Sequence, residues 1–230
     1  MNGWNGPEQE KTRNMFSHAV DFYKNLFGAV EDLGVHLGVK FWDEEDKVTT
    51  SEHELLEAPF TEDEIKTAIF ESYAEGAPGP DGFSFHFYQV FWETIKIDFM
   101  NLVKDFESGQ LNLDRINYAI ITLIPKEAEA KHLKKFRPIS LINCSFKIFA
   151  KALNNRLIRL AARLICANQT AFIKGRFILE SVVAAHEIIH DIRRCNESGV
   201  ILKLDYEKAY DRVSWGFIEE MLFSRGFGAK

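Results

Sequence analysis

The chain has 230 residues, of which 46% are hydrophobic and 27% charged. This ordinary globular balance excludes low-complexity, collagen-like and wholly disordered proteins. No uncharged apolar run approaches the ~20 residues of a membrane span, and residues 1–13 lack the apolar core of a secretory signal. The three cysteines have no metal-ligand spacing, which favours a reducing compartment. We therefore expect an intracellular protein without membrane contact, either nuclear or cytoplasmic.

The charge is divided unevenly along the chain. Residues 1–115 carry 9 basic and 23 acidic side chains, whereas residues 116–230 carry 19 basic and 11 acidic ones. Within 126–176, 12 Lys and Arg stand against two Glu. A positive field this concentrated favours contact with a polyanion, and the alternative is a solvated basic face.

The first expected elements are helices. Apolar residues at helical spacing predict a helix over 8–28. Thr61, with Glu64 three residues later, predicts a capping box at the start of another helix. Two prolines and two glycines within 77–82 interrupt regular structure, and a long aromatic-rich helix is expected over 84–106.

The middle of the chain predicts two strands and a basic helix. The β-branched run 118–124 and the run 138–142 read as strands, joined by the polar, Lys-rich loop 126–136. Asn143 or Ser145 can cap a helix that runs to about residue 165. Its expected core stripe consists of Phe146, Phe149, Leu153, Leu157, Leu160 and Leu164. The residues off that stripe are the basic Lys147, Lys151, Arg156, Arg159 and Arg163.

The carboxyl-terminal third predicts a helix over 179–194, then a buried strand over 200–204 that runs into Asp205. Ser214 can cap a last helix, which Gly226 can end. A carboxylate at a strand end, near a basic surface, suits Mg²⁺ held between protein and phosphate. The alternative is an Asp that ends the strand and caps the next helix.

One short motif points to a different chemistry. His186, Glu187 and His190 form a literal H-E-x-x-H on an expected helix, the pattern of zinc metalloproteases. Arg193 stands where the extended metzincin pattern requires Gly, so that extension fails. Chance alone produces this pattern in about one such chain in fifty, and Glu219 or Glu220 could be a distant third ligand. We do not expect a zinc role, because the helix lies inside a longer stretch whose motifs indicate a different chemistry.

Several segments together carry a family resemblance. The chain resembles the reverse transcriptases of non-LTR (LINE-type) retrotransposons, particularly those of plants, in their amino-terminal part. The similar segments, in family order, are HAVDFYKNLFG (18–28), FWDEEDKVT (41–49), LLEAPFTEDEIKTAIF (55–70), APGPDGFSFHFYQVFW (77–92), ITLIPK (121–126), FRPISLINCSFKIFAKALNNRL (136–157), QTAFIKGRFI (169–178), LKLDYEKAYDRVSW (202–215) and GFIEEMLFSRGFGAK (216–230).

The resemblance implies an α+β fold, the fingers and first part of the palm of a right-hand polymerase, truncated. It divides the chain into a helical lead-in over 1–58, a fingers-like region over 59–142 and a third region over 143–230. The third region would hold the helices along the template path and the start of the palm. The implied activity is RNA-directed DNA synthesis, with an RNA template, a DNA primer and deoxynucleotides as partners.

The resemblance also implies roles for individual residues. Asp205 would be catalytic, as a ligand of two Mg²⁺ ions. The implied nucleotide-binding residues are Lys126 and Arg137 at the triphosphate, with Tyr206, Ala209 and Tyr210, the last excluding a 2′-hydroxyl. The implied contacts to template and primer are made by Lys147, Lys151, Arg156, Lys174 and Arg176.

The chain also departs from the family pattern. The family's second catalytic carboxylate pair is an Asp-Asp dipeptide, and none occurs in the 230 residues. Gly76 stands where the family usually has Lys. We therefore expect a fragment that is inactive alone, and the alternatives are a non-catalytic nucleic-acid-binding module or an inert remnant. The oligomeric state is not predicted.

Overall fold

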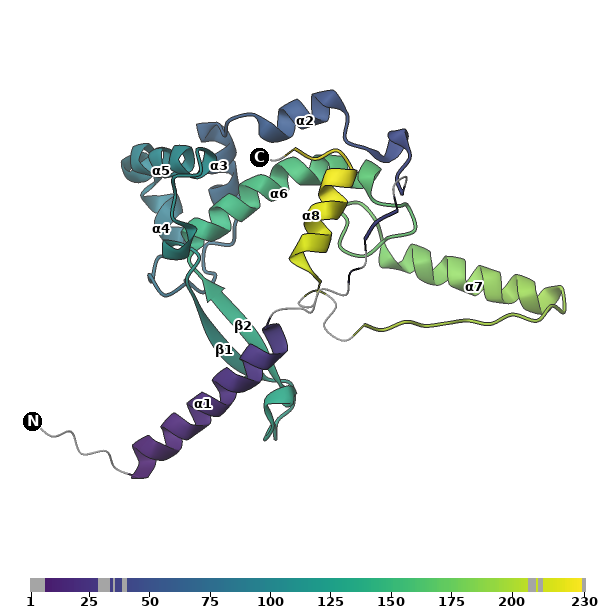
Figure 1. Ribbon diagram of the computed structural model, residues 1–230, viewed down its shortest axis with the longest axis horizontal. Helices are drawn as coiled ribbons and strands as arrows, with labels where there is room; N and C mark the ends of the chain where they lie inside the picture. Colours follow the sequence, from purple (N-terminus) through teal and green to yellow (C-terminus); the bar gives the residue numbers. More distant parts are fainter. Residues whose placement is uncertain are drawn as a thin grey trace, which may run out of the picture. The chain divides into compact units, whose positions relative to one another are not determined.

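The computed structural model describes residues 7–28, 34, 36–38, 41–206, 210 and 213–228. The chain forms two compact units, each built from separate stretches of sequence. Unit 1 comprises Met1–Phe41, Leu123–Pro138 and Lys203–Ser224. Unit 2 comprises Trp42–Thr122, Ile139–Leu202 and Arg225–Lys230. Figure 1 labels the helices and strands of both.

Unit 2 is helical. Its helices are α2 (Thr50–Glu57), α3 (Glu62–Phe70), α4 (Phe85–Val90), α5 (Trp92–Glu107), α6 (Cys144–Leu164) and α7 (Ile178–Arg194). Short 3₁₀ turns are found at η1 (Glu44–Asp46) and η2 (Leu113–Arg115). Helix α6 packs against α2 and α3, and α3 also contacts α4 and α5 (Figure 1). This arrangement encloses one hydrophobic core.

The core of unit 2 combines aromatic and aliphatic side chains. Its largest fully buried side chains are Trp92, Ile65, Ile69, Ile148, Val103 and Cys144. Phe149 of α6 stacks on Phe99 of α5 with ring centroids 5.8 Å apart, and it meets Phe106 at 4.8 Å. Burying each such side chain contributes roughly 1.5–3 kcal/mol. The contact between Phe99 and Phe149 joins two helices, α5 and α6, whose contacting residues are 50 positions apart in sequence.

Capping boxes start two of these helices. The predicted box at Thr61 is confirmed: its hydroxyl accepts from the Glu64 amide, and the Glu64 carboxylate accepts from the Thr61 amide. Thr49 and Glu52 form the same arrangement at the start of α2. Each box satisfies amides that have no partner inside the helix.

The single helix expected over 84–106 is wrong, because Phe91 separates α4 from α5. Phe91 has φ −98° and ψ 13°, and its carbonyl accepts from the amides of Thr94 and Ile95. The bend allows Tyr88 on one side and Trp92 on the other to be buried in the same core. Without a proline or glycine at the bend, the sequence alone gave no sign of it.

Helix α6 confirms the predicted bounds, and Phe149, Leu160 and Leu164 of the predicted core stripe are buried. Leu153 and Leu157 are exposed, whereas Ala152 and Arg156 are buried. The buried positions therefore follow a spacing of four residues from Ile148 to Leu164. The predicted stripe differs from this face at positions 152 and 156, because a small Ala and a charged Arg do not mark a buried face by their hydrophobicity.

Unit 1 contains α1 (Pro7–Phe27), α8 (Trp215–Ser224) and the outer end of a two-stranded hairpin. The strands are β1 (Ala119–Pro125) and β2 (Phe136–Ile142), with η3 (Leu133–Lys135) in the loop between them. The Lys126 amide donates to the Lys135 carbonyl at 2.8 Å and closes the hairpin. Ser214 caps α8 through the Phe217 amide, as predicted, and Gly226 follows the helix with φ +85°.

The buried strand predicted over 200–204 is wrong. Residues 201–206 are irregular and exposed, and the side chain of Val200 is 97% exposed. A strand needs a neighbour for its backbone hydrogen bonds and a packed face for its side chains. Within the part of the chain that the structure describes, the one sheet is the β1–β2 pair.

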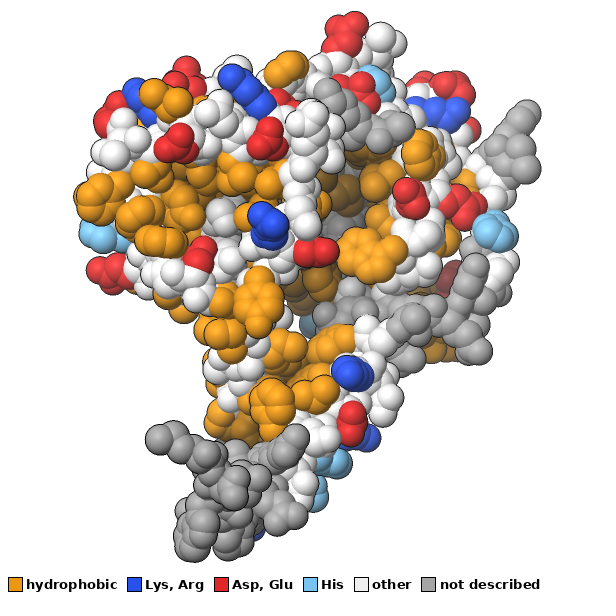
Figure 2. All heavy atoms as spheres, turned by 60° about the vertical axis from the view of Figure 1, so that its left-hand side comes forward, with side chains coloured by type: hydrophobic (Ala, Val, Ile, Leu, Met, Phe, Trp, Pro, Cys, Tyr) orange, Lys and Arg blue, Asp and Glu red, His pale blue; other side chains and the backbone are white. Residues whose placement is uncertain are grey.

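Many large apolar side chains lie at the surface, and Figure 2 shows them gathered in orange patches. They include Phe70, Val90 and Ile97 of unit 2 and Phe16 of unit 1. None of the helices in the described ranges is both long enough and apolar enough to cross a membrane.

Candidate nucleic-acid interface

The loop end of the hairpin carries a cluster of cations. Lys126 follows β1, and its ammonium donates to the Lys134 carbonyl at 3.1 Å. Lys135 pairs with Glu127 at 2.5 Å. Arg137 in β2 is exposed, and its guanidinium makes no hydrogen bond or ion pair with any residue that the structure describes. The hairpin therefore confirms that Lys126 and Arg137 share one element, although the Lys126 ammonium points to the loop backbone.

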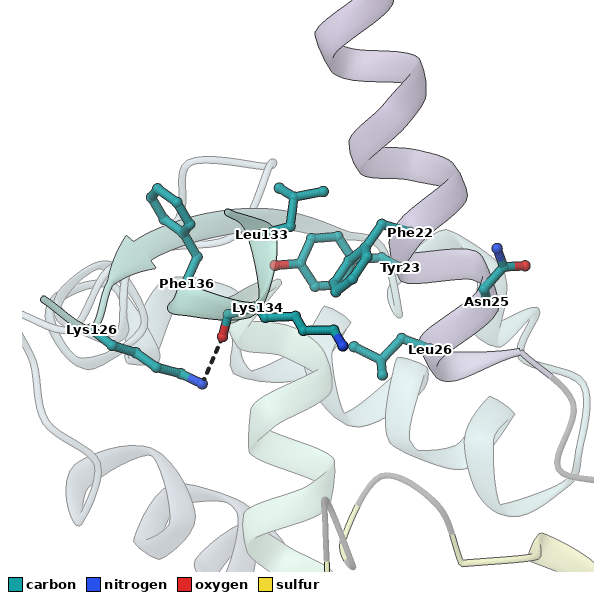
Figure 3. A pocket seen from close by; sticks show the side chains of 8 residues that line it. All are labelled: Phe22, Tyr23, Asn25, Leu26, Lys126, Leu133, Lys134 and Phe136. Atoms are coloured by element: carbon teal, nitrogen blue, oxygen red, sulfur yellow. Dashed lines mark hydrogen bonds between the residues drawn. The ribbon is translucent and has the colours of Figure 1, made fainter. Parts of the chain in front are cut away.

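A pocket of about 310 Å³ lies beside this cluster, within unit 1 (Figure 3). Helix α1 and the hairpin supply its walls, and the lining residues are Phe22, Tyr23, Asn25, Leu26, Lys126, Leu133, Lys134 and Phe136. Its walls are therefore aromatic and aliphatic, with two lysines among them. Sequence reasoning identified Lys126 but not this pocket.

Tyr23 is the central residue of the pocket. Its side chain is 8% exposed, and its hydroxyl has no hydrogen-bond partner among the described residues. In Figure 3 the hydroxyl points toward the hairpin. Its ring is fixed by an edge contact with Phe22 at 5.1 Å and by stacking on Phe27 at 5.8 Å. Burial raises the pKa of Tyr23, so the phenol stays protonated and can donate.

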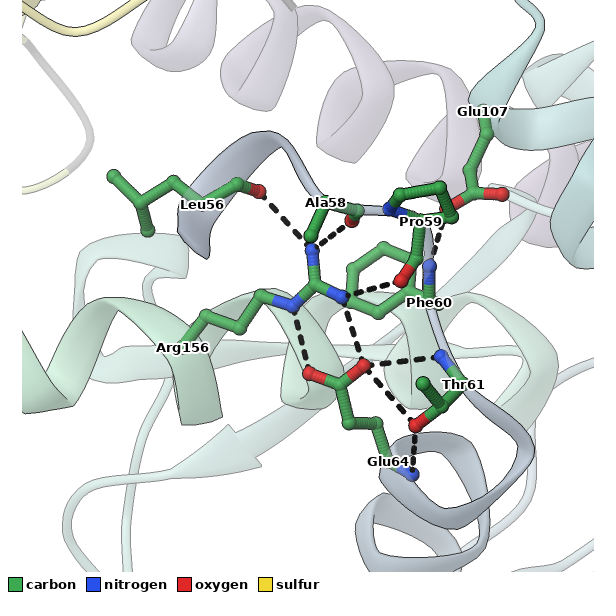
Figure 4. Close-up of polar contacts among 8 residues, drawn as sticks. All are labelled: Leu56, Ala58, Pro59, Phe60, Thr61, Glu64, Glu107 and Arg156. Carbon is green, nitrogen blue, oxygen red and sulfur yellow. Dashed lines mark hydrogen bonds and ion pairs between the residues drawn. The ribbon is translucent and has the colours of Figure 1, made fainter. Parts of the chain in front are cut away.

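The structure gives Arg156 a role different from the predicted contact with nucleic acid. Its guanidinium is buried and donates to both carboxylate oxygens of Glu64 at 2.8 Å (Figure 4). The remaining donors bond to three carbonyls at the end of α2 and in the turn that follows it, and the group lies 3.9 Å from the Phe60 ring centre. Those carbonyls belong to Leu56, Ala58 and Pro59.

This arrangement leaves no Arg156 donor for a phosphate. The hydrogen bonds from Arg156 lower the pKa of Glu64 to about 2. The buried guanidinium therefore stabilises the fold and is not part of the candidate interface. Arg156 follows Ala152 by four residues and precedes Leu160 by four. This helical spacing is the sequence signal that places Arg156 on the buried face of α6.

Three further predicted cations also make contacts inside unit 2. Arg176 donates to the carbonyls of the last turn of α6 and the loop after it, at Ala162, Ile165, Cys166 and Gln169. Lys151 pairs with Glu71 at 3.3 Å, and Lys147 donates to the Ala77 carbonyl at 3.3 Å. Lys174 is exposed in the loop before α7.

The predicted catalytic segment is exposed. Asp205 and Tyr206 lie in the irregular stretch of unit 1, Tyr210 is 96% exposed, and Ala209 lies outside the described residues. No three His, Cys, Asp or Glu side chains come together as a possible metal site within the described ranges. His186 and His190 are on α7, as expected of the H-E-x-x-H motif, but no third ligand joins them there.

The predicted site residues divide between the units. Lys126, Arg137 and Asp205 belong to unit 1, whereas the five residues predicted to contact template and primer belong to unit 2. Four of those five have contacts within unit 2, and Lys126 and Lys135 of the hairpin also have contacts within their own loop. Among the predicted cations, Arg137 and Lys174 are exposed and make no side-chain hydrogen bond or ion pair with a described residue.

Comparison with known proteins gives consistent matches. Residues 124–230 match the family described as reverse transcriptase (RNA-dependent DNA polymerase). The chain is 33% identical over 224 residues to the transposon TX1 uncharacterized 149 kDa protein of Xenopus laevis, covering 97% of this chain and 17% of that protein. It is 29% identical over 155 residues to the retrovirus-related Pol polyprotein from type-1 retrotransposable element R2 of Nasonia vitripennis, covering 67% of this chain and 14% of that protein. The chain thus spans less than a fifth of either relative.

Proposed function

We propose that this chain, which carries part of a reverse transcriptase domain of the non-LTR retrotransposon family, binds nucleic acid through its hairpin. The observation that carries the proposal is the group of cations at the loop end of β1 and β2. Residues 126–137 hold five Lys and Arg and two Glu, and the family match begins just before them. Such a surface attracts phosphates and releases their counterions.

The finer roles follow from the resemblance. Lys126 and Arg137 bind the triphosphate of a deoxynucleotide, and the hairpin is part of the fingers. Tyr206, Ala209 and Tyr210 contact the nucleotide at the start of the palm. An RNA template and a DNA primer are the partners of the whole enzyme, and the exposed Lys174 of unit 2 is proposed to contact them.

Asp205 is the proposed metal ligand, but the described residues do not form a complete site for Mg²⁺. Two-metal phosphoryl transfer needs carboxylates from more than one segment. The exposed Asp205 belongs to no group of three or more His, Cys, Asp or Glu side chains among those residues. The described arrangement therefore does not fit the pair of ions, and no catalytic step through a metal follows from it.

A salt titration tests the proposed binding. The complete chain is titrated with a single-stranded 20-nucleotide RNA in a filter-binding assay at increasing salt. The logarithm of affinity should fall linearly with the logarithm of salt, by roughly 0.7 for each phosphate contact. Replacing both Lys126 and Arg137 by Ala should reduce that slope by about 1.4.

Lys104→Ala is the matched control, because this exposed lysine is on α5, away from the hairpin in sequence. It should leave the slope unchanged. Binding that does not respond to salt, or no binding at all, would contradict the proposed function and favour an inert fragment.

A further inference from the structure

We propose that the pocket between α1 and the hairpin holds the base of one unpaired nucleotide in a nucleic-acid strand. This inference rests on the proposed function, because it names what the hairpin region would recognise beyond phosphate. The pocket belongs to unit 1 and has a volume of about 310 Å³, within the range of small-ligand sites.

The walls of the pocket match the flat faces of a base. Phe22 and Tyr23 supply aromatic rings from α1, and Phe136 supplies another from the start of β2 (Figure 3). Leu26 and Leu133 complete the apolar lining. Stacking on such rings does not depend on base identity, because every base has a π-face. We therefore expect binding without strong sequence preference.

The Tyr23 hydroxyl lacks a hydrogen-bond partner within the described ranges, so an occupant of the pocket that carries an acceptor is favoured. A buried hydroxyl without a partner is costly, by about 1–3 kcal/mol. The hydroxyl has almost no accessible surface of its own, so a small rotation of the Tyr23 side chain brings it to the carbonyl and ring-nitrogen acceptors on the edge of a base. An aliphatic occupant would leave the hydroxyl unsatisfied, so the pocket favours a ring that carries acceptors.

The cations indicate that the base is attached to phosphate. Lys126 and Lys134 line the pocket together with Phe136. Phe136 and Arg137 are consecutive residues of β2, so their side chains point to opposite faces of the hairpin. Of the two residues assigned to the incoming triphosphate, Lys126 lines this pocket and Arg137 lies on the other face of the hairpin. The pocket therefore holds one half of that pair, and we assign it to a base whose phosphates belong to a strand.

The test compares strands with and without bases. A single-stranded 12-nucleotide DNA with one central 2-aminopurine is titrated into the complete chain, beside an otherwise identical DNA that is abasic throughout. We expect the base-containing strand to bind about fivefold to hundredfold more tightly. The 2-aminopurine fluorescence should be quenched as the base stacks in the pocket.

Two variants localise the effect. Phe136→Ala should lower the affinity toward that of the abasic strand and abolish the quenching, with an unchanged salt slope. Tyr23→Phe keeps the ring and the fold but removes the donor, so affinity should fall about threefold to tenfold while quenching persists. Phe16→Ala, at an exposed residue of α1 outside the pocket, is the control and should change neither readout.

The outcomes separate the two proposals. If no strand binds, the proposed function itself fails. If both strands bind equally with a steep salt slope, the function stands and the base pocket is wrong. If free deoxynucleoside monophosphate competes at micromolar concentration, the pocket binds free nucleotides and the assignment to a strand is overturned.

Discussion

At the scale of single residues, Arg156 shows how a cation can be removed from a binding surface by its backbone position. Its guanidinium bonds to Glu64 and to the turn between α2 and α3, and it lies over Phe60. Breaking a buried ion pair by removing one partner leaves the other charge uncompensated. The residue thus fixes the turn that leads into α3.

We expect Arg156→Ala to lower the free energy of unfolding by about 3–5 kcal/mol, measured by urea denaturation. Arg159→Ala, at an exposed position less than one turn further along α6, should change it by less than about 0.5 kcal/mol. A loss below 1 kcal/mol for Arg156→Ala would show that the guanidinium is not needed for folding.

The same contact predicts a pH dependence. Hydrogen bonds from Arg156 hold the folded pKa of Glu64 at about 2, below the ordinary value of 4.5. The stabilisation is therefore present above pH 4.5 and is lost as the pH falls toward 2. Glu64→Gln should flatten this part of the curve of urea midpoint against pH, whereas Glu54→Gln on the exposed side of α2 should not.

At the scale of elements, the turn at 77–82 is tied to the start of α6. The Asp81 amide donates to the Asn143 side-chain oxygen at 3.2 Å. Asn143 is one of two predicted capping residues of α6, but its side chain makes no capping hydrogen bond to that helix. Gly79 lies so close that an added Cβ would collide with the backbone nitrogen and side-chain oxygen of Asn143. The glycine is thus required for this close approach.

Gly79→Ala should therefore destabilise unit 2 by about 1–3 kcal/mol, because the turn must move away from α6. Thermal unfolding followed by circular dichroism measures the change. Gly38→Ala is the control, since nothing lies within 4 Å of an added Cβ there. Equal midpoints for the two variants would mean that the turn adapts without cost.

Local signals in the sequence predicted most elements. The capping box at Thr61 and the strands on either side of 126–136 depend on neighbouring residues alone, and the structure confirms them. The bend at Phe91 and the burial of Arg156 depend on which helices pack together in the core. A local sequence pattern does not predict that packing. The strand over 200–204 failed because its apolar residues have no neighbouring strand in the described ranges.

At the scale of the whole molecule, the predicted site residues divide between the two units. Most predicted binding cations of unit 2 make hydrogen bonds or ion pairs within that unit, whereas unit 1 holds the exposed Arg137 and the aromatic pocket. The sequence predicted Lys126 and Arg137 because they flank a turn. It could not predict the pocket, since Tyr23 and Phe136 are 113 residues apart and meet only in the fold.

Photo-crosslinking tests most directly whether the hairpin is the nucleic-acid interface. A single-stranded RNA containing 4-thiouridine is irradiated with the complete chain, and the adducts are mapped by mass spectrometry. We predict adducts within residues 126–137 and on Tyr23 or its neighbours in α1, lost at high salt. Adducts confined to the acidic stretch over 41–115, or none at all under conditions of measured binding, would contradict the account.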